Sequence, residues 1–277
     1  MHNAALKAVG EQGEYEQCPI EPHSAGSVDL LQNIDDIKNG IENCHKSGRL
    51  LDGFNVTMPL KSKAYVWVQE RGRLASNLGS AAHAMHVINT VKLEDRVPVG
   101  FNTDEIGFMQ PLQNANLKYA TVILLGAGGA ARTIAATLGA NIKAKKIIVW
   151  NRNPDKAGSL KKAIEAAFRF IEQSSSIDLV EDIHQLPVEG SRLFINATPM
   201  GQQGSDNIPK GILDRLHREL TVYDIVYEPR ETELVRAARK RGCTVITGDR
   251  MLAAQGAEAF RIWTGKTHAL DGTPIVN

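Results

Sequence analysis

Cysteine is scarce in this sequence. The three cysteines, Cys18, Cys44 and Cys243, lie far apart and lack the spacing of metal ligands. A small secreted domain held together by disulfides carries more cysteines, usually in even number. We therefore predict reduced thiols, no disulfide framework, no metal site and a reducing compartment, the cytoplasm.

The sequence also lacks a long hydrophobic run. Its longest apolar stretch, around Val122 to Ala131, is too short and too rich in glycine to cross a bilayer. The opening residues, MHNAALKAVGEQGEYE, contain no apolar core of the kind found in signal peptides. These features predict a protein without a membrane segment or a secretion signal.

An excess of charge of either sign is absent as well. The 32 basic and 31 acidic residues leave a net charge of +1, so electrostatics provides no reason to expect a polyanionic partner. Basic clusters near residues 143–146 and 239–241 are interpreted as solvated helix ends. We predict that the protein has no nucleic-acid partner.

The chain does have the length and the apolar content to build cores, with 277 residues of which 43% are hydrophobic. Strand and helix patterns alternate from end to end, which is typical of α/β proteins with parallel sheets. Six β-rich runs occur at residues 121–126, 146–151, 177–180, 193–198, 221–227 and 244–248. Apolar residues at helical spacing lie between them. The pattern predicts a doubly wound sheet over residues 107–248.

The first hundred residues show a separate and less regular α/β pattern. It predicts helices over about residues 3–9 and 28–39 and after Pro59, and strands over 15–20 and 51–56. A hairpin is expected to turn at Glu94 and Asp95. Because this unit opens on a helix, the strand that would begin a β-α alternation is either missing from the chain or lost from the sheet.

The segment LLGAGGAAR, residues 124–132, has the G-x-G-x-x-G/A spacing of a dinucleotide-binding turn. It follows a predicted strand and opens a predicted helix, as this motif requires. The glycines let the backbone approach a pyrophosphate, whose charge the helix N-terminus would stabilise. A purely structural tight turn is the alternative. The expected cofactor-binding residues here are Gly126, Ala127, Gly128, Gly129 and Ala130.

The end of the next strand indicates which dinucleotide binds. NAD-dependent enzymes usually place Asp or Glu there to bind the ribose 2′-hydroxyl. This strand ends instead in Asn151, Arg152 and Asn153, with Lys156 close behind. Guanidinium pairs with phosphate through two parallel hydrogen bonds, so these four residues are predicted to bind the 2′-phosphate of NADP. The alternatives are a solvated Arg152, or NAD binding with Asp155 nearby.

Eight motifs follow one another over nearly the whole chain. They are GFNVTMPLK (53–61), INT (88–90), GFNTDEIGF (100–108), GAGGAAR (126–132), NRNPDKA (151–157), NATPMG (196–201), DIVYEPRETEL (224–234) and GDRMLAAQGAEAF (248–260). In this order they resemble the shikimate dehydrogenase family, which includes quinate/shikimate dehydrogenases. The resemblance implies an NADP-dependent oxidoreductase acting on a CH-OH group, which reduces 3-dehydroshikimate to shikimate in the biosynthesis of chorismate and aromatic amino acids.

The resemblance also implies a domain organisation. An α/β substrate domain would cover residues 1–106, a Rossmann-type NADP-binding domain 107–248, and a C-terminal helical segment, 249–277, would return to the first domain. The family acts on a small-molecule substrate, and we expect a monomer or homodimer. Hydride transfer requires the domains to close over both ligands, so hinge motion is expected.

Individual residues acquire roles from the same resemblance. Lys61 and Asp104 match the family's catalytic pair, and a lysine ammonium held by a carboxylate can donate a proton to a developing alkoxide. Without the motif, Lys61 would be interpreted as a surface residue at a helix start. The positions that match the substrate pocket are Thr57, Lys61, Asn89, Asp104, Tyr227 and Gln255. The further positions that match cofactor contacts are Thr198, Ile225, Gly248 and Met251.

Three features depart from the family pattern. The family has a first strand with two serines that bind the substrate carboxylate, and this sequence opens just after that position, so we expect a shortened chain or an altered carboxylate site. His86 and Val87 replace a usual Gly-Ala pair, which would reshape the pocket, and Glu105 replaces a common glycine. His83 and His86 are interpreted as helix-surface residues, not as a metal pair.

Three functions are compatible with the sequence. They are an NADP-dependent shikimate dehydrogenase, a dehydrogenase of quinate or another cyclic hydroxy acid, and a non-catalytic sensor of a nucleotide or a shikimate-pathway ligand. The presence of both Lys61 and Asp104 favours an enzyme, because a binding protein has no need of a proton donor. We predict the first of the three.

Overall fold

A computed structural model describes residues 2–11, 14–15, 51–57, 60–113, 115, 117–118 and 120–266 of the chain. These residues form two compact units. The first unit comprises the described residues of Met1–Gly79, His86–Thr103 and Gly256–Leu270, and the second those of Ser80–Met85 and Asp104–Gln255. The boundaries expected after residues 106 and 248 stay predictions. Apart from Tyr15, the strand expected over 15–20 and the helix over 28–39 lie outside the described residues.

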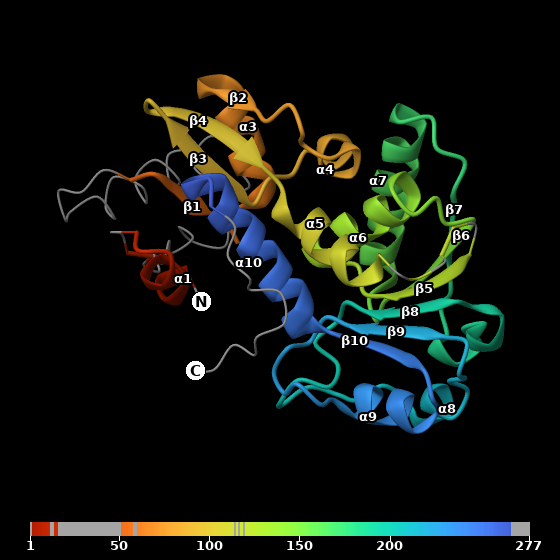
Figure 1. Cartoon of the computed structure of the whole chain (residues 1–277). Helices are drawn as coiled ribbons and strands as arrows, with labels where there is room; N and C mark the ends of the chain where they lie inside the picture. The colour runs from red at the N-terminus through yellow and green to blue at the C-terminus, as the bar shows by residue number, and fades with distance from the viewer. Residues whose placement is uncertain are drawn as a thin grey trace. The chain divides into compact units, whose positions relative to one another are not determined.

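A parallel sheet of six strands, in the order β10-β9-β8-β5-β6-β7, forms the centre of the second unit (Figure 1). The strands are β5 (Thr121–Leu125), β6 (Lys146–Trp150), β7 (Ser176–Leu179), β8 (Leu193–Asn196), β9 (Thr221–Asp224) and β10 (Thr244–Thr247). Each falls within one of the six predicted runs or begins one residue before it. The predicted doubly wound parallel sheet is therefore confirmed.

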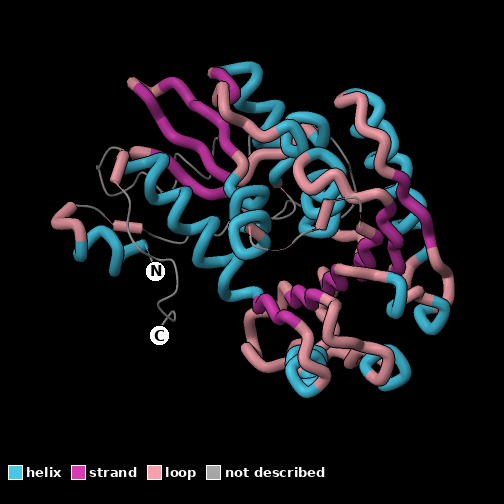
Figure 2. The backbone as a smooth tube through the Cα atoms, turned by 45° about the vertical axis from the view of Figure 1, so that its right-hand side comes forward, coloured by secondary structure: helices cyan, strands magenta, loops and turns pink. Residues whose placement is uncertain are grey.

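Helices cover both faces of this sheet, and Figure 2 shows them on either side of its strands. On one side lie α6 (Gly129–Ala140) and α7 (Pro154–Phe170), and on the other lie α8 (Lys210–Leu213) and α9 (Glu233–Lys240). Short 3-10 turns occur at Gln110–Leu112, Ile183–Gln185 and Val188–Gly190. Side chains cap the N-termini of α7 and α9. Asn153 accepts from Lys156 N–H at 3.0 Å, and Thr232 accepts from Val235 N–H at 3.2 Å.

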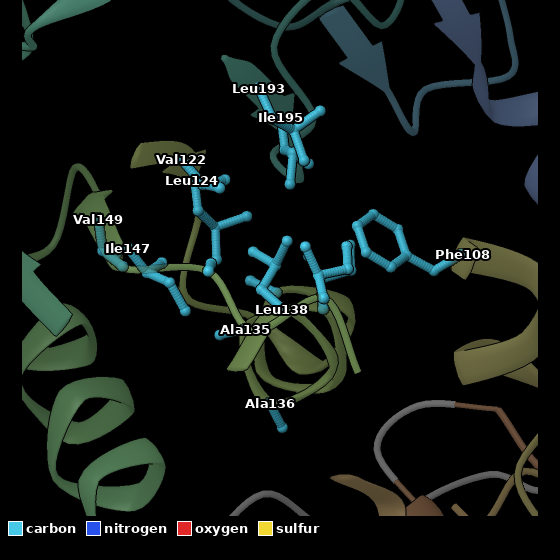
Figure 3. Close-up of a cluster of buried hydrophobic side chains, with 14 of the residues drawn as sticks. Phe108, Val122, Leu124, Ala135, Ala136, Leu138, Ile147, Val149, Leu193 and Ile195 are labelled. Carbon is cyan, nitrogen blue, oxygen red and sulfur yellow. The ribbon is translucent and has the colours of Figure 1, made fainter. Parts of the chain in front are cut away.

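Neighbouring residues of β5 point into two different cores. Val122 and Leu124 belong to the core beneath α6 and α7, whereas Ile123 and Leu125 belong to the core on the α8 and α9 side. Figure 3 shows the first of these cores, in which Leu124 and Ile195 lie toward α6. A strand buried on both faces has a continuous apolar sequence, as TVILL does. Each such buried side chain contributes about 1.5–3 kcal/mol of transfer free energy.

The first unit contains a smaller mixed sheet of four strands in the order β1-β3-β4-β2. The strands are β1 (Gly53–Asn55), β2 (Arg73–Leu74), β3 (Thr90–Glu94) and β4 (Val97–Phe101), with α1 (His2–Ala8) and α3 (Lys61–Arg71) in the same unit. The β3–β4 hairpin turns at Asp95 and Arg96, one residue later than predicted, and both have positive φ, 50° and 69°. Two positive φ values give the turn a twist that matches a hairpin.

Three helices lie at the points of the sequence where the chain passes from one unit to the other. They are α4 (Ser80–Met85), α5 (Thr103–Met109) and α10 (Gly248–Thr264). α4 packs within the second unit through Ala81, which is buried in the core beneath α6. α10 belongs to the second unit up to Gln255 and to the first from Gly256. Among the helices of the described ranges, none has both the length and the apolar composition needed to cross a membrane.

Candidate active site

The glycine-rich turn after β5 lies between the ends of its two neighbouring strands. Gly126 N–H donates to Trp150 O at the end of β6, at 2.8 Å. On the other side, a Cβ on Gly126 would lie 2.6 Å from Ala197 O, just after β8. Gly126 also has a φ of 113°, a value that residues with a side chain rarely adopt. Both the conformation and the close approach therefore require glycine here.

The next glycine, Gly128, opens the N-terminus of α6. It is extended and exposed, no side chain caps the helix, and a Cβ at Gly128 would meet no atom within 4 Å. The 12 residues of α6 align their peptide dipoles, so the N–H groups of the first turn form a site for an anion. Ala127 is buried, and Gly129 and Ala130 are half-buried in that turn. This arrangement fits a pyrophosphate.

The loop after β6 presents a cation at the same edge of the sheet. The Arg152 side chain is 86% exposed, and its Nη1 lies 3.4 Å from Oδ2 of Asp206. Asn153 caps α7, and Asn151 Nδ2 donates to Asn153 O at 2.8 Å, so both amides shape the loop. The exposed Lys156 follows in the first turn of α7. The guanidinium is thus accessible to a phosphate.

The ends of β8 and β9 are joined by buried polar side chains that the sequence analysis did not identify. Asn196 Nδ2 donates to Oδ1 of Asp224 and to Met200 O, at 2.9 Å each, and Asn196 Oδ1 accepts from Thr198 Oγ1 at 2.6 Å. Thr232 Oγ1 donates to Oδ2 of Asp224 at 2.6 Å. Thr198, a predicted cofactor contact, is therefore held in place by this network.

Asp224 is fully buried, and burial raises the pKa of its carboxyl, whereas the hydrogen bonds from Thr232, Val226 N–H and Asn196 lower it. Asn196 ends β8 and Asp224 ends the adjacent strand β9. Both residues therefore lie at the carboxyl edge of the sheet, where ligands of α/β proteins bind. Their place at that edge is the signal that could have revealed them in the sequence. We name Asn196, Thr198, Asp224 and Thr232 the strand-end network.

The remaining predicted residues of the second unit lie just after β9, on α10 and on α5. A Cβ on Gly248 would lie 2.2 Å from Ile225 O, so the start of α10 passes close to the end of β9. Further along α10, Met251 and Gln255 lie close to α5. A Cβ on Gly107 of α5 would lie 2.9 Å from both Gln255 Cβ and Met251 O. These glycines allow three backbone segments to approach closely. Each segment carries at least one predicted site residue.

Asp104 and Tyr227 differ in exposure. Asp104 lies in the first turn of α5 and is 6% exposed, and a carboxylate is favoured there by the helix dipole. Tyr227 lies on the loop after β9 and is 52% exposed, which is high for a large aromatic residue. Its phenol can donate and accept hydrogen bonds with a hydroxylated ligand.

In the first unit, Lys61 is the first residue of α3 and is half-buried. Neither an acidic residue in the first turn nor a side-chain cap accompanies it. The positive end of a helix dipole disfavours a cation by about 0.3–1 kcal/mol, so helix stability does not account for this lysine. Its backbone oxygen accepts from Ile88 N–H at 3.3 Å, next to Asn89. Thr57, also predicted to contact substrate, is exposed.

Asn89 has a structural role that the sequence analysis did not foresee. It is 6% exposed, its Oδ1 accepts from Thr103 N–H at 2.8 Å, and its Nδ2 donates to Thr103 Oγ1 at 3.1 Å. Oδ1 also accepts from Thr90 Oγ1 at 3.0 Å. The side chain thus holds the end of β4 where α5 begins, and its contact with a substrate stays a prediction.

The family departures at positions 86 and 105 have specific environments. His86 has a φ of 51°, a left-handed conformation that favours the glycine expected there, and its ring centroid lies 5.1 Å from that of Tyr65. His83 instead contacts the ring of Phe170. Glu105 is buried, and its Oε2 accepts from Ala82 N–H at 3.3 Å. The extra carboxylate is therefore hydrogen-bonded within the second unit.

Comparison with known proteins identifies the relatives of this chain. The family model for shikimate / quinate 5-dehydrogenase matches residues 110–185, and the model for the shikimate 5'-dehydrogenase C-terminal domain matches residues 250–267. The shikimate dehydrogenase (NADP(+)) of Methanothermobacter thermautotrophicus is 32% identical over 273 residues, which cover 98% of this chain and 87% of the relative. The chain belongs to the shikimate dehydrogenase family.

Solved shikimate dehydrogenase relatives have the same fold. A shikimate dehydrogenase in complex with NADP+ has a TM-score of 0.73 and 30% identity, over 96% of this chain and 84% of its own. The quinate dehydrogenase of Corynebacterium glutamicum in complex with NAD has a TM-score of 0.73 and 25% identity, over 96% of this chain and 88% of its own. The family resemblance inferred from the eight motifs is confirmed.

Proposed function

We propose that the chain is an NADP-dependent shikimate dehydrogenase, which interconverts 3-dehydroshikimate and shikimate. The observation that carries this proposal is the 32% identity to a shikimate dehydrogenase (NADP(+)) over 98% of the chain. A match over that share of the chain extends over the described residues of both units and not over the cofactor-binding part alone. The substrate is accordingly a small molecule with a carboxylate, hydroxyls and one reducible ring ketone.

The residues at the edge of the second unit's sheet fit NADP. The open space at Gly128 and the uncapped N-terminus of α6 would receive the pyrophosphate, and the exposed guanidinium of Arg152 would pair with the 2′-phosphate. Lys156 and Asn151 would add a charge and an amide donor beside it. When bound, NADP supplies or accepts the hydride through its nicotinamide ring, toward which we assign Ile225, Gly248 and Met251.

The chain's own side chains would handle the proton. Lys61 donates it to the alkoxide oxygen as the ketone is reduced, and the neutral amine accepts it in the reverse direction. Asp104 is assigned to hold the ammonium in position. Thr57, Asn89, Tyr227 and Gln255 supply hydroxyl, amide and phenol groups, which can bond to a polyol as donors or acceptors.

An absorbance assay at the nicotinamide band tests this function. The purified chain would be given shikimate or quinate, each with NADP+ or NAD+, in four separate reactions. We expect the highest kcat/KM with shikimate and NADP+. If none of the four reactions proceeds while NADPH still binds, the chain is a sensor and the enzymatic assignment is wrong.

Quinate is the second candidate substrate. The fold similarity to the quinate dehydrogenase of Corynebacterium glutamicum, at a TM-score of 0.73, is the observation that favours it. Quinate and shikimate share the carboxylate and several hydroxyls, so the same donors and acceptors serve both. A higher kcat/KM for quinate than for shikimate in the same assay would support this second candidate over the first.

A further inference from the structure

We propose that Asp206 is a specificity-determining residue that weakens the preference of the enzyme for NADP over NAD. The inference rests on the proposed function, because it concerns the residue that would bind the 2′-phosphate, Arg152. The observation behind it is the placement of the Asp206 carboxylate against the Arg152 guanidinium, from a loop 54 residues later in the chain.

The loop that carries Asp206 is organised by its own backbone. Gly201 N–H donates to Asp206 O at 2.9 Å, and Ser205 N–H donates to Gln202 O at 3.0 Å. The loop follows β8, whereas Arg152 follows β6, and β5 lies between these two strands. The loop therefore extends past the glycine-rich turn at the end of β5 to reach Arg152.

The contact is of the kind that a phosphate can replace. Arg152 Nη1 lies 3.4 Å from Asp206 Oδ2, at the long end of hydrogen-bond distances, and the two side chains are 86% and 80% exposed. A phosphate would accept two parallel hydrogen bonds from the same guanidinium. The single long contact does not hold Arg152 rigidly, so Asp206 acts on it mainly through its charge.

The negative charge of the Asp206 carboxylate repels a 2′-phosphate. Arg152 and Lys156 contribute two positive charges around the end of β6, while Asp155 and Asp206 contribute two negative ones. The local sum is therefore zero before a phosphate arrives, and a phosphate would meet one attractive guanidinium with a carboxylate beside it. A 2′-hydroxyl carries no charge and is not repelled in this way. Asp206 should thus lower the affinity for NADP and leave that for NAD unchanged.

Binding titrations of NADPH and NADH by nucleotide fluorescence test the proposal on the full chain. In Asp206→Asn we expect NADPH to bind about two- to five-fold more tightly, as is typical for one exposed charge interaction, with NADH unchanged. The gain should shrink at high salt, because exposed charges are screened. In the Arg152→Ala background, the same substitution should have less effect, which a double-mutant cycle measures.

A matched control is Asp214→Asn, which removes the same charge from another exposed pair of the second unit, with Arg241 at 3.0 Å. NADPH affinity should not change in that variant. An Asp206→Asn variant that binds NADPH as the unmodified chain does, or more weakly, overturns the inference and leaves the proposed function standing. If the unmodified chain binds neither dinucleotide, the proposed function and this inference both fail.

Discussion

At the scale of single residues, Lys61 occupies a helix position that does not favour a cation. It opens α3, whose dipole is positive at that end, and the first turn of the helix contains no acidic residue. Lys63, two positions on, belongs to the same helix and matches no catalytic position of the family. The two lysines therefore form a natural pair for testing whether the charge at position 61 has a chemical use.

Lys61→Ala is expected to lower kcat by at least about two orders of magnitude, as loss of an acid/base group does. NADPH affinity should change little, because the cofactor is assigned to the second unit. Steady-state kinetics and nucleotide fluorescence measure the two quantities, with Lys63→Ala as the control that keeps its activity. A kcat for Lys61→Ala equal to that of the control would remove Lys61 from the mechanism.

Glu105 is a buried carboxylate with structural partners in the second unit. Burial raises the pKa of its carboxyl, and hydrogen bonds from Ala82 N–H and the Asn141 side chain lower it by less. A carboxyl whose pKa is higher in the folded chain stabilises the fold most when it is protonated. Its contribution is therefore complete below the unfolded value of 4.5 and is lost as the pH rises toward the folded value.

Glu105→Gln retains an oxygen to accept from Ala82 N–H but cannot ionise. We expect the free energy of unfolding of this variant, relative to the unmodified chain, to increase as the pH rises above 4.5. Denaturant unfolding of both proteins at several pH values between about 4 and 8 gives the difference directly. A difference that stays constant over this range would show that Glu105 does not titrate with a raised pKa.

At the scale of elements, the strand-end network fixes the loops that would contact the ligands. Thr232 illustrates how it does so, since one hydroxyl both caps α9 and donates to Asp224. Asp224 in turn accepts from Asn196, whose oxygen positions Thr198. The start of α9, the end of β9 and the loop after β8 are therefore held together by buried hydrogen bonds.

Thr232→Val keeps the shape of the side chain and removes the hydroxyl. The N–H of Val235 loses its acceptor, and one oxygen of the buried Asp224 carboxylate loses its donor. We therefore expect the free energy of unfolding to fall by about 2–4 kcal/mol. Thr232→Ser retains the hydroxyl and should lose less than half of that amount. Urea unfolding compares the two variants. A larger loss in Thr232→Ser than in Thr232→Val would indicate that the methyl group, and not the hydroxyl network, is what matters at this position.

At the scale of the whole chain, the end of α10 packs against strands that are far away in sequence. Trp263 Nε1–H donates to Val91 O in β3 at 2.9 Å, although 172 residues separate them. Gly53 makes this contact possible, because a Cβ there would lie 2.3 Å from Val91 O and 2.4 Å from Trp263 Nε1. Three distant segments of the first unit thus meet at one glycine.

Gly53→Ala is therefore expected to destabilise the protein by about 1–3 kcal/mol, the usual cost of overpacking. Gly158 in α7 provides the control, because a Cβ there would meet no atom within 4 Å. Gly158→Ala should instead stabilise the protein by about 0.5–1 kcal/mol through helix propensity. Thermal unfolding distinguishes the two, and a Gly53→Ala variant as stable as the Gly158 control would contradict the close packing described here.

Local sequence patterns predicted the secondary structure of the second unit well. β5 is an example, because a strand buried on both faces must be apolar at every position, and TVILL is. The turn at Gly126 was recognisable for the same reason, since a few adjacent residues determine it. The cap that Asn153 provides to α7 was not predicted, because this residue was assigned to the 2′-phosphate. The hairpin turn was displaced by one residue to Asp95 and Arg96, a position that only the strand register defines.

The candidate site was predictable only in part. Motifs assigned roles to Lys61, Asp104 and Arg152, because side chains with distinctive chemistry stand next to recognisable turns and helix starts, and these roles stay predictions. The link between Asn196 and Asp224 was not predicted, since 28 residues separate them and only the pairing of β8 with β9 brings them together. Asn89 was assigned to a substrate, and its bonds to Thr103 became evident only from the path of β3 and β4.

The sequence by itself determined the elements, the family and the chemistry available, because periodicity, turn residues and motifs are properties of short segments. The tertiary structure decided which of these segments meet. Strand order placed Asp206 against Arg152, and the course of α10 brought Trp263 to Val91. Such contacts depend on how buried surfaces are shared between distant segments, and no short stretch of sequence contains that information.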